Sequence, residues 1–232
     1  MKHRTAFLLI FLLAILQARA QSKIDEGQTG VWYMAFLNKQ FNNTSFGVQG
    51  DYQFRYWDTT SDREQILLRT GLTFTPKDAG VMFTWGYAHI STGDFGESTA
   101  SFPENRMYQE ALIPHKIGGR FYLTHRYRYE QRWIEGQDFR TRYRYNLFLN
   151  VPINGTALAK NIFYLALYNE IFINGERNIG EGRSVALFDR NRTYLGAGYG
   201  LRDNLRVQLG WMLQTTDPWA KGQLQVSLHQ NW

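Results

Sequence analysis

The chain has 232 residues, with 26 Lys and Arg against 20 Asp and Glu, and it contains no cysteine. The lack of cysteine excludes disulfides and thiolate metal sites. The net charge of +6 raises the question of nucleic-acid binding, but the basic residues are nearly all arginines set within tyrosine-rich alternating segments, whereas nucleic-acid-binding arms are more often basic runs without alternation.

Residues 1–20 have the three parts of a secretory signal peptide. A basic start at 2–4 precedes an unbroken apolar run at 6–16, and the small-x-small sequence at 18–20 matches a cleavage site. A transmembrane anchor is the alternative, but these 11 apolar residues are too few, since spanning a bilayer takes roughly 20. We therefore expect cleavage near Ala20/Gln21, and because no cysteine follows, a lipoprotein anchor is excluded.

The mature chain is aromatic yet polar on average. Aromatic residues make up 16% of the chain, while its mean hydropathy is −0.43. Strands with one apolar and one polar face reconcile the two values, because alternation averages out along the chain. We assign 21–43 to an N-terminal segment with a short β run at 31–37, where the alternation is weak, and 44–232 to the alternating part.

Two-residue alternation recurs between turn signals along the rest of the chain. The predicted strands before the last one are 44–57, 64–75, 80–91, 105–114, 119–133, 138–151, 161–173, 190–201 and 205–214. The last strand shows the pattern best, with Leu224, Val226, Leu228 and Trp232 on one face and mainly polar residues on the other. A terminal aromatic residue on such a strand is what the outer-membrane insertion machinery reads in related barrels, so we interpret this apolar face as the insertion signal.

A soluble periplasmic β-sandwich also alternates, but three features favour a membrane barrel. The strands are long, at mostly 10–15 residues, whereas soluble strands centre near 5–6 residues and membrane-spanning strands need about 9–11. Aromatic residues gather at strand ends, and short connections alternate with longer polar ones. We predict an all-β, single antiparallel up-and-down transmembrane β-barrel of about 10 strands, with 12 possible, and with its short turns in the periplasm.

The polar faces of the central strands are rich in arginine, tyrosine and glutamate. If the apolar faces meet lipid, these faces line the lumen. The predicted lumenal charge network is Arg126, Arg128, Glu130, Arg132, Arg140, Arg142, Arg144, Glu170, Arg190 and Arg192. The same two-residue alternation on the other strands adds Asp51, Arg55, Arg69, Glu110 and Arg206 to the lumenal face. The predicted lumen then contains 11 arginines and four carboxylates.

Two interpretations of this network are open. In the first, which we rank first, arginine–glutamate pairs fill the interior of a small barrel of structural or accessory role. In the second, the excess of positive charge attracts small anions, so that the barrel is a narrow channel or a binding protein. The deciding observation is whether the lumenal arginines are paired or face an open cavity.

A lipid-modifying enzyme of the outer membrane is the third hypothesis. Ser227 and His229 share the polar face of the last strand and are the best candidate pair for a nucleophile and its base. We find no nucleophile elbow, no zinc-binding helix motif and no other convergent constellation. We therefore expect no catalytic residues, no metal and no cofactor.

The order of features resembles the family known as domain of unknown function 2490 (DUF2490), which is common in Bacteroidetes-type bacteria. The similarity runs from about Gly30 to Trp232. It rests on Gly30-Val31-Trp32, on the runs Arg126–Arg132 and Arg142-Tyr143-Arg144, on Asn169-Glu170-Ile171-Phe172 and on the glycine-rich Gly196–Gly200. The resemblance implies a barrel in the outer membrane of a Gram-negative bacterium, and it brings no activity or site residues. The expected partners are outer-membrane lipid, the barrel-insertion machinery, and a small anion or an unidentified membrane-complex partner, but no nucleic acid.

Overall fold

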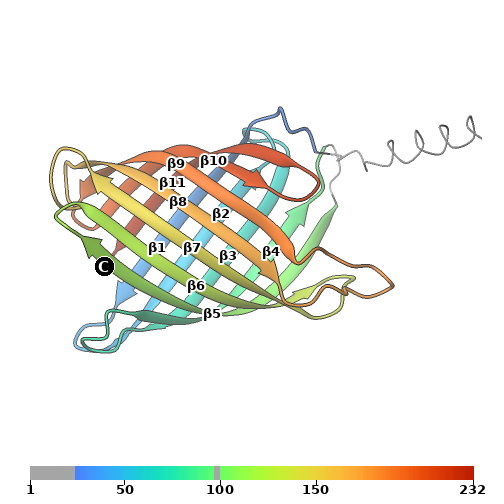
Figure 1. The fold of residues 1–232 in the computed structure, drawn as a ribbon, viewed down its shortest axis with the longest axis horizontal. Helices are drawn as coiled ribbons and strands as arrows, with labels where there is room; N and C mark the ends of the chain where they lie inside the picture. Colours follow the sequence, from blue (N-terminus) through green and yellow to red (C-terminus); the bar gives the residue numbers. More distant parts are fainter. Residues whose placement is uncertain (1–23, 97–99) are drawn as a thin grey trace, which may run out of the picture.

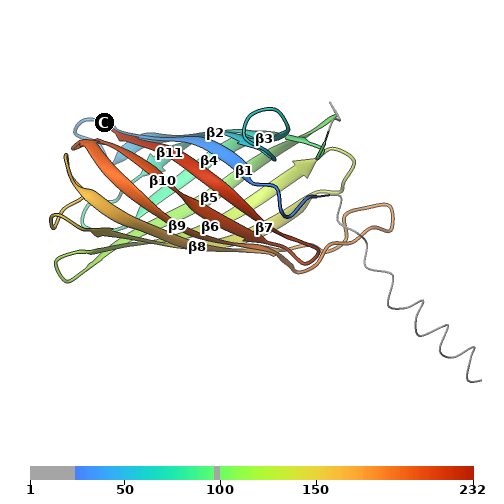
Figure 2. The same cartoon turned by 90° about the horizontal axis from the view of Figure 1, so that it is seen from above.

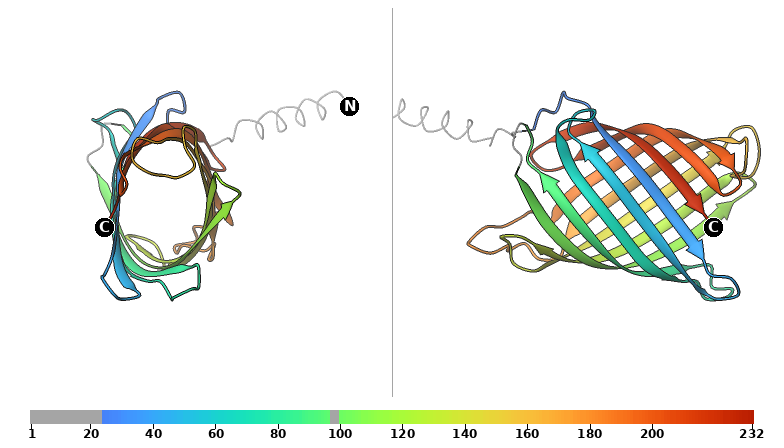
Figure 3. Two further views of the ribbon diagram at one scale, coloured as in Figure 1. Left: turned by 90° about the vertical axis from the view of Figure 1, so that its left-hand side faces the viewer. Right: turned by 180° about the vertical axis from the view of Figure 1, so that it is seen from behind.

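The computed structural model describes residues 24–96 and 100–232, which form a closed β-barrel with steeply tilted strands (Figure 1). The expected signal peptide and its cleavage point lie outside the described residues. The strands are β1 Gly30–Gln40, β2 Phe46–Tyr56, β3 Arg63–Phe74, β4 Met82–Gly93, β5 Ser101–Ile117, β6 Phe121–Ile134, β7 Arg140–Pro152, β8 Phe163–Asn174, β9 Phe188–Arg202, β10 Leu205–Thr215 and β11 Ala220–Asn231. The barrel has an oval cross-section, which the end-on view shows (Figure 3, left). Seen from above, the strands run obliquely to the long axis of the barrel (Figure 2).

Each strand pairs with the next in antiparallel fashion, and the sheet closes between β1 and β11. This closing pair is parallel, with Gly30 beside Gln223 and Asn38 beside Asn231, because an odd number of alternating strands brings the first and last into the same direction. The all-β barrel predicted from the sequence is confirmed, and its 11 strands are close to the expected 10. The added strand is β1, so the barrel begins at Gly30 and not at residue 44 as the sequence suggested.

The connections divide between the two ends of the barrel. The end that carries the connections 41–45, 75–81, 118–120, 153–162 and 203–204 is here named the turn end. The opposite end, named the loop end, carries 57–62, 94–100, 135–139, 175–187 and 216–219. The shortest connections, 118–120 and 203–204, lie at the turn end, and the longest, 175–187, lies at the loop end. The expected alternation of short and long connections is partial, because 153–162 at the turn end is longer than 216–219 at the loop end.

Alternation along most strands sends apolar side chains outward and polar ones inward. In β11, Gln223, Gln225 and Ser227 are buried, while Val226 and Leu228 are exposed on the outer face. In β6, Arg128 and Glu130 are buried and Tyr127 is exposed. This is the reverse of a water-soluble barrel and matches the pattern of barrels that meet lipid.

Aromatic side chains gather on the outer face toward both ends. Phe46 packs on Phe74 near the turn end, with ring centroids 5.1 Å apart, and Trp133 packs on Phe139 near the loop end at 5.3 Å. Trp232 follows β11 at the turn end and is 56% exposed. No helix within the two described ranges is long and apolar enough to cross a membrane.

Inward-facing glycines make room for tyrosine rings from neighbouring strands. Gly86 of β4 is in register with Tyr108 of β5, whose buried ring lies over it. Gly198 of β9 is in register with Tyr164 of β8 and is covered in the same way. These contacts fill the inner surface of the sheet, which no second sheet covers.

Replacing Gly86 with alanine should therefore destabilise the barrel. A Cβ at this position would overlap the Tyr108 ring, and overpacking of this kind typically costs about 1–3 kcal/mol. Urea unfolding in detergent measures the effect, with Gly119→Ala as the control because a Cβ there has open space. Equal stability of the two variants would show that the Tyr108 ring moves aside freely.

Candidate lumenal binding site

The side chains that point into the barrel include many of its arginines. Twelve arginines line a lumenal cavity of about 710 Å³. Within the described residues, eight of these arginines form ion pairs with carboxylates, and four do not. The paired set is Arg69, Arg106, Arg126, Arg128, Arg132, Arg142, Arg144 and Arg190, and the unpaired set is Arg55, Arg140, Arg192 and Arg206. The lumen is therefore neither fully neutralised nor packed solid.

The ion pairs on β5 to β8 form one side of the lumen, which we name the paired wall, and Glu130 lies at its centre. Its carboxylate lies 2.7 Å from Arg142 Nη2 and 2.5 Å from Arg144 Nη1, and the side chain is 1% exposed. Arg144 also reaches Glu170 at 2.5 Å, and Glu170 in turn accepts from Arg126 at 2.7 Å. Bidentate and shared guanidinium contacts of this kind are strong and geometrically specific.

Two further carboxylates extend this wall along β5. Glu104 binds Arg106 and Arg132, with an Nε–Oε1 distance of 2.6 Å to each. Glu110 binds Arg128, whose Nε lies 2.6 Å from Oε2. Every inward carboxylate of β5 and β6 is thus matched by at least one arginine on its own or an adjacent strand.

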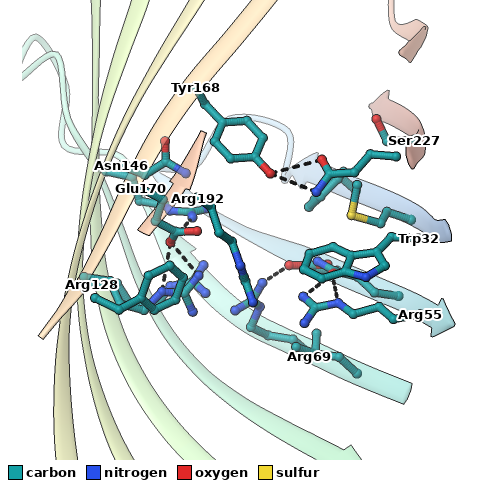
Figure 4. A pocket seen from close by; sticks show the side chains of 18 of the residues that line it. Trp32, Arg55, Arg69, Arg128, Asn146, Tyr168, Glu170, Arg192 and Ser227 are labelled. Atoms are coloured by element: carbon teal, nitrogen blue, oxygen red, sulfur yellow. Dashed lines mark hydrogen bonds and ion pairs between the residues drawn. The ribbon is translucent and has the colours of Figure 1, made fainter. Parts of the chain in front are cut away.

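The facing side of the lumen, built by β1, β2 and β9, holds cations without carboxylate partners. Figure 4 shows Trp32 beside Arg55, with Arg192 lying between Trp32 and the paired wall. The guanidinium carbon of Arg55 is 3.9 Å from the centroid of the Trp32 ring, and that of Arg192 is 4.8 Å from the same centroid. These distances are within the range of cation–π attraction. We name Trp32, Arg55 and Arg192 the cationic site.

Neutral side chains hold the two arginines in place. Arg55 donates from Nη1 to Gln65 at 2.7 Å and from Nε to Gln53 at 2.9 Å. Arg192 donates from Nε to Gln214 at 2.7 Å, and its two terminal nitrogens make no hydrogen bond within the described part of the chain. These terminal nitrogens of Arg192 are therefore available to a ligand in the cavity, whereas all three guanidinium nitrogens of Arg55 donate to Gln53 or Gln65.

Glu64 is the nearest acid to the cationic site, and it orients the indole. Its Oε2 accepts a hydrogen bond of 2.7 Å from Trp32 Nε1. Glu64 forms no ion pair within the described residues. The surroundings of Trp32 therefore contain two arginines, Arg55 and Arg192, and one carboxylate, that of Glu64. Tyr168 completes the border by exchanging hydrogen bonds of 2.9 and 3.1 Å with Gln225.

The loop end of the cavity is bordered by aromatic residues. The Trp57 ring lies edge-on to Trp219, with centroids 6.4 Å apart, and both rings line the cavity. Asp58 holds the loop after Trp57 in shape by accepting hydrogen bonds from backbone amides of the same loop. The hydrogen bond from the Ser61 hydroxyl, together with these amides, holds the pKa of Asp58 below its ordinary value. Lys221 anchors the segment before β1 by donating to the Asp25 carbonyl at 3.0 Å.

The structure shows where the residues of the predicted lumenal network lie. All ten residues of the predicted network point inward, as do Asp51, Arg55, Arg69, Glu110 and Arg206. The sequence reasoning missed the inward residues Trp32, Glu64, Glu104, Arg106, Asp189 and Lys221. Extending the alternation of 105–114 backward by one residue would have found Glu104, and forward counting on that strand would have found Arg106.

The candidate catalytic pair does come together, and it lies in the lumen. Ser227 Oγ is 3.0 Å from His229 Nε2, and the His229 ring stacks on Phe36 at 4.8 Å. Within residues 24–96 and 100–232, no carboxylate contacts His229 to orient it. In the same ranges, no group of three His, Asp or Glu is arranged to hold a metal ion.

Comparison with known proteins gives a family but no activity. The family model described as protein of unknown function (DUF2490) matches residues 29–225. An uncharacterized protein of Methylorubrum extorquens is 28% identical over 227 residues, which cover 93% of this chain and 91% of that protein. No solved structure matches the chain.

Proposed function

The chain belongs to the DUF2490 family, and from this premise and the charges in its lumen we propose that it is an outer-membrane β-barrel that binds small anions. The observation that carries the binding proposal is the set of four lumenal arginines without carboxylate partners around a cavity of about 710 Å³. Such a cavity is within the usual size of small-molecule sites, about 300–1,000 Å³.

The outer face supports the membrane location. Exposed apolar side chains cover every strand, and aromatic pairs lie toward both ends. A water-soluble protein rarely exposes apolar patches on this scale. The expected signal peptide would deliver the chain to the periplasm, from which outer-membrane barrels insert. The Bacteroidetes-type source stays a prediction.

The membrane proposal predicts that the protein fractionates with outer membranes and shows heat-modifiable mobility on gels. Replacing Trp232 with alanine should lower the folded, heat-modifiable fraction, because it removes the aromatic end of the proposed insertion signal. Trp85→Ala is the control, since Trp85 is also exposed on the outer face but lies on β4. Recovery of the wild-type chain in the soluble periplasmic fraction would contradict the proposal.

The charge balance supports an anionic ligand. The cationic site presents free guanidinium donors in a confined, partly desolvated space, where electrostatic attraction is stronger than in water. Calorimetric titration of the detergent-solubilised barrel with phosphate and with organic acids tests the proposal. We expect saturable binding that weakens as salt increases, and no binding of any anion would contradict it.

A structural or accessory barrel is the second candidate, and the paired wall favours it. Eight arginines are already satisfied by carboxylates, which is what closure of a small barrel by its own side chains requires. This candidate predicts that the lumen takes no ligand and conducts no ions. The same titration therefore separates the two functions.

The proposal makes the chain a binding protein and not an enzyme. Ser227 and His229 touch, but nothing among the described residues orients the imidazole as a third catalytic group would. We expect no hydrolysis of phospholipid or of p-nitrophenyl esters above background, and the same result from Ser227→Ala. Ester hydrolysis that disappears in Ser227→Ala would overturn this expectation.

A further inference from the structure

We propose that the anion bound in the lumen is an amphiphilic organic acid, whose carboxylate sits at the cationic site and whose apolar body lies along β1 toward the turn end. This inference rests on the proposed function and narrows its ligand. It adds an observation that the charges alone do not give, which is an apolar part of the cavity lining near the turn end.

Arg55 and Arg192 define where the carboxylate of the proposed ligand would bind. The terminal nitrogens of Arg192 are free of hydrogen bonds within the described residues, and its side chain lies between Trp32 and the paired wall (Figure 4). A guanidinium presents its donors in a planar fork that matches the two oxygens of a carboxylate. The rings of Trp32 and Phe172 each lie 4.8 Å from the guanidinium carbon of Arg192, so the fork is supported by aromatic faces.

The apolar surface begins directly beside this head group. Met34 and Phe36 are the next inward positions after Trp32 on β1, and both line the cavity. With a strand rise of about 3.3–3.4 Å per residue, Met34 lies roughly 7 Å and Phe36 roughly 13 Å along β1 from Trp32. Leu112 and Phe148, on the facing strands β5 and β7, line the same cavity.

The paired wall explains why these apolar residues are unusual. On β5 to β7 the inward positions nearer the loop end are mostly charged, whereas Leu112 and Phe148 lie beyond Glu110 and Arg144 on their strands, toward the turn end. Met34 packs partly against the buried cluster that contains Trp32, and Phe36 stacks on His229, but both side chains also line the cavity. A ligand that covers the apolar area facing the cavity removes that area from water, which is favourable. A free phosphate would use the arginines and leave this surface wet.

The test compares three probes on the solubilised full-length barrel by calorimetry: 4-phenylbutyrate, its neutral analogue 4-phenylbutan-1-ol, and inorganic phosphate. The alcohol also reports non-specific partitioning into detergent. We expect 4-phenylbutyrate to bind at least about tenfold more tightly than either other probe, a difference of about 1.4 kcal/mol.

Two variants test the cationic part and the apolar part of the site separately. Arg192→Gln should weaken both 4-phenylbutyrate and phosphate, because it removes the shared cation. Met34→Gln should weaken 4-phenylbutyrate alone, since it replaces apolar surface with an amide of similar length. Met107→Gln is the matched control, because Met107 is exposed on the outer face, and heat-modifiable mobility verifies that each variant folds.

The outcomes separate the two proposals. If phosphate binds as tightly as 4-phenylbutyrate, or Met34→Gln leaves 4-phenylbutyrate binding unchanged, the amphiphilic ligand is wrong and anion binding stands. If neither anion binds the wild-type barrel, both proposals fall. If the alcohol binds as tightly as the acid, the lumen holds apolar molecules without using its cations, which also overturns the inference.

Discussion

Replacing Glu130 with glutamine should destabilise the barrel by about 3–5 kcal/mol, because removing one partner of a buried ion pair leaves the other charge uncompensated. Glu130 is 1% exposed and accepts from Arg142 and Arg144 at 2.7 and 2.5 Å. Glutamine keeps the shape of the side chain and removes its charge. Urea unfolding of the refolded variant in detergent, followed by tryptophan fluorescence, measures the loss.

The control is Glu181→Gln on the loop end. Glu181 pairs with Arg183 at 3.1 Å, but it is 82% exposed, and exposed substitutions of this kind usually change stability by less than about 0.5 kcal/mol. A Glu130→Gln variant no less stable than this control would mean that water reaches the paired wall and replaces the carboxylate.

Replacing Arg192 with glutamine should have the opposite profile, with a large effect on binding and a small one on stability. A charge about 4 Å from a ligand anion contributes up to about 4 kcal/mol at an effective dielectric constant of 20, so at least a tenfold loss of anion affinity is expected. Stability should change by no more than about 1–2 kcal/mol, since no ion pair with a carboxylate is lost and only the hydrogen bond to Gln214 and the cation–π contacts are removed.

Calorimetry and urea unfolding on the same preparation measure both quantities for Arg192→Gln. The control is Arg183→Gln, because Arg183 lies in the exposed loop after β8 and outside the cavity. Equal anion affinity in Arg192→Gln and the wild-type barrel would show that the cationic site does not bind the anion, whatever the stability of the variant.

Most of the fold was predictable because an apolar outer face and a polar lumen impose alternation on most strands. Leu224, Val226 and Leu228 on one face of β11, with Gln223 and Gln225 on the other, show this clearly. The strand that the sequence did not place in the barrel is β1, and the reason is physical. Its inward positions include Trp32, Met34 and Phe36, so apolar residues occupy both faces and the two-residue pattern disappears.

Part of the content of the lumen was predictable, but its pairing was not. Alternation assigns Arg142, Arg144 and Arg192 to the same face, and nothing in their spacing distinguishes them. Arg192 is even in register with Glu170 across β8 and β9, yet it forms no ion pair there. Glu170 is already bound by Arg126 and Arg144, from β6 and β7. Which arginine stays free therefore depends on strand tilt and on competition across several strands.

The most direct test of lumenal anion binding is to locate an anion in crystals of the barrel soaked in bromide. The account predicts anomalous scattering peaks inside the lumen, beside Arg192 and Arg55, that are lost in crystals of Arg192→Gln. Bromide found only on the loops or the outer surface, with the lumen occupied by water alone, would contradict it.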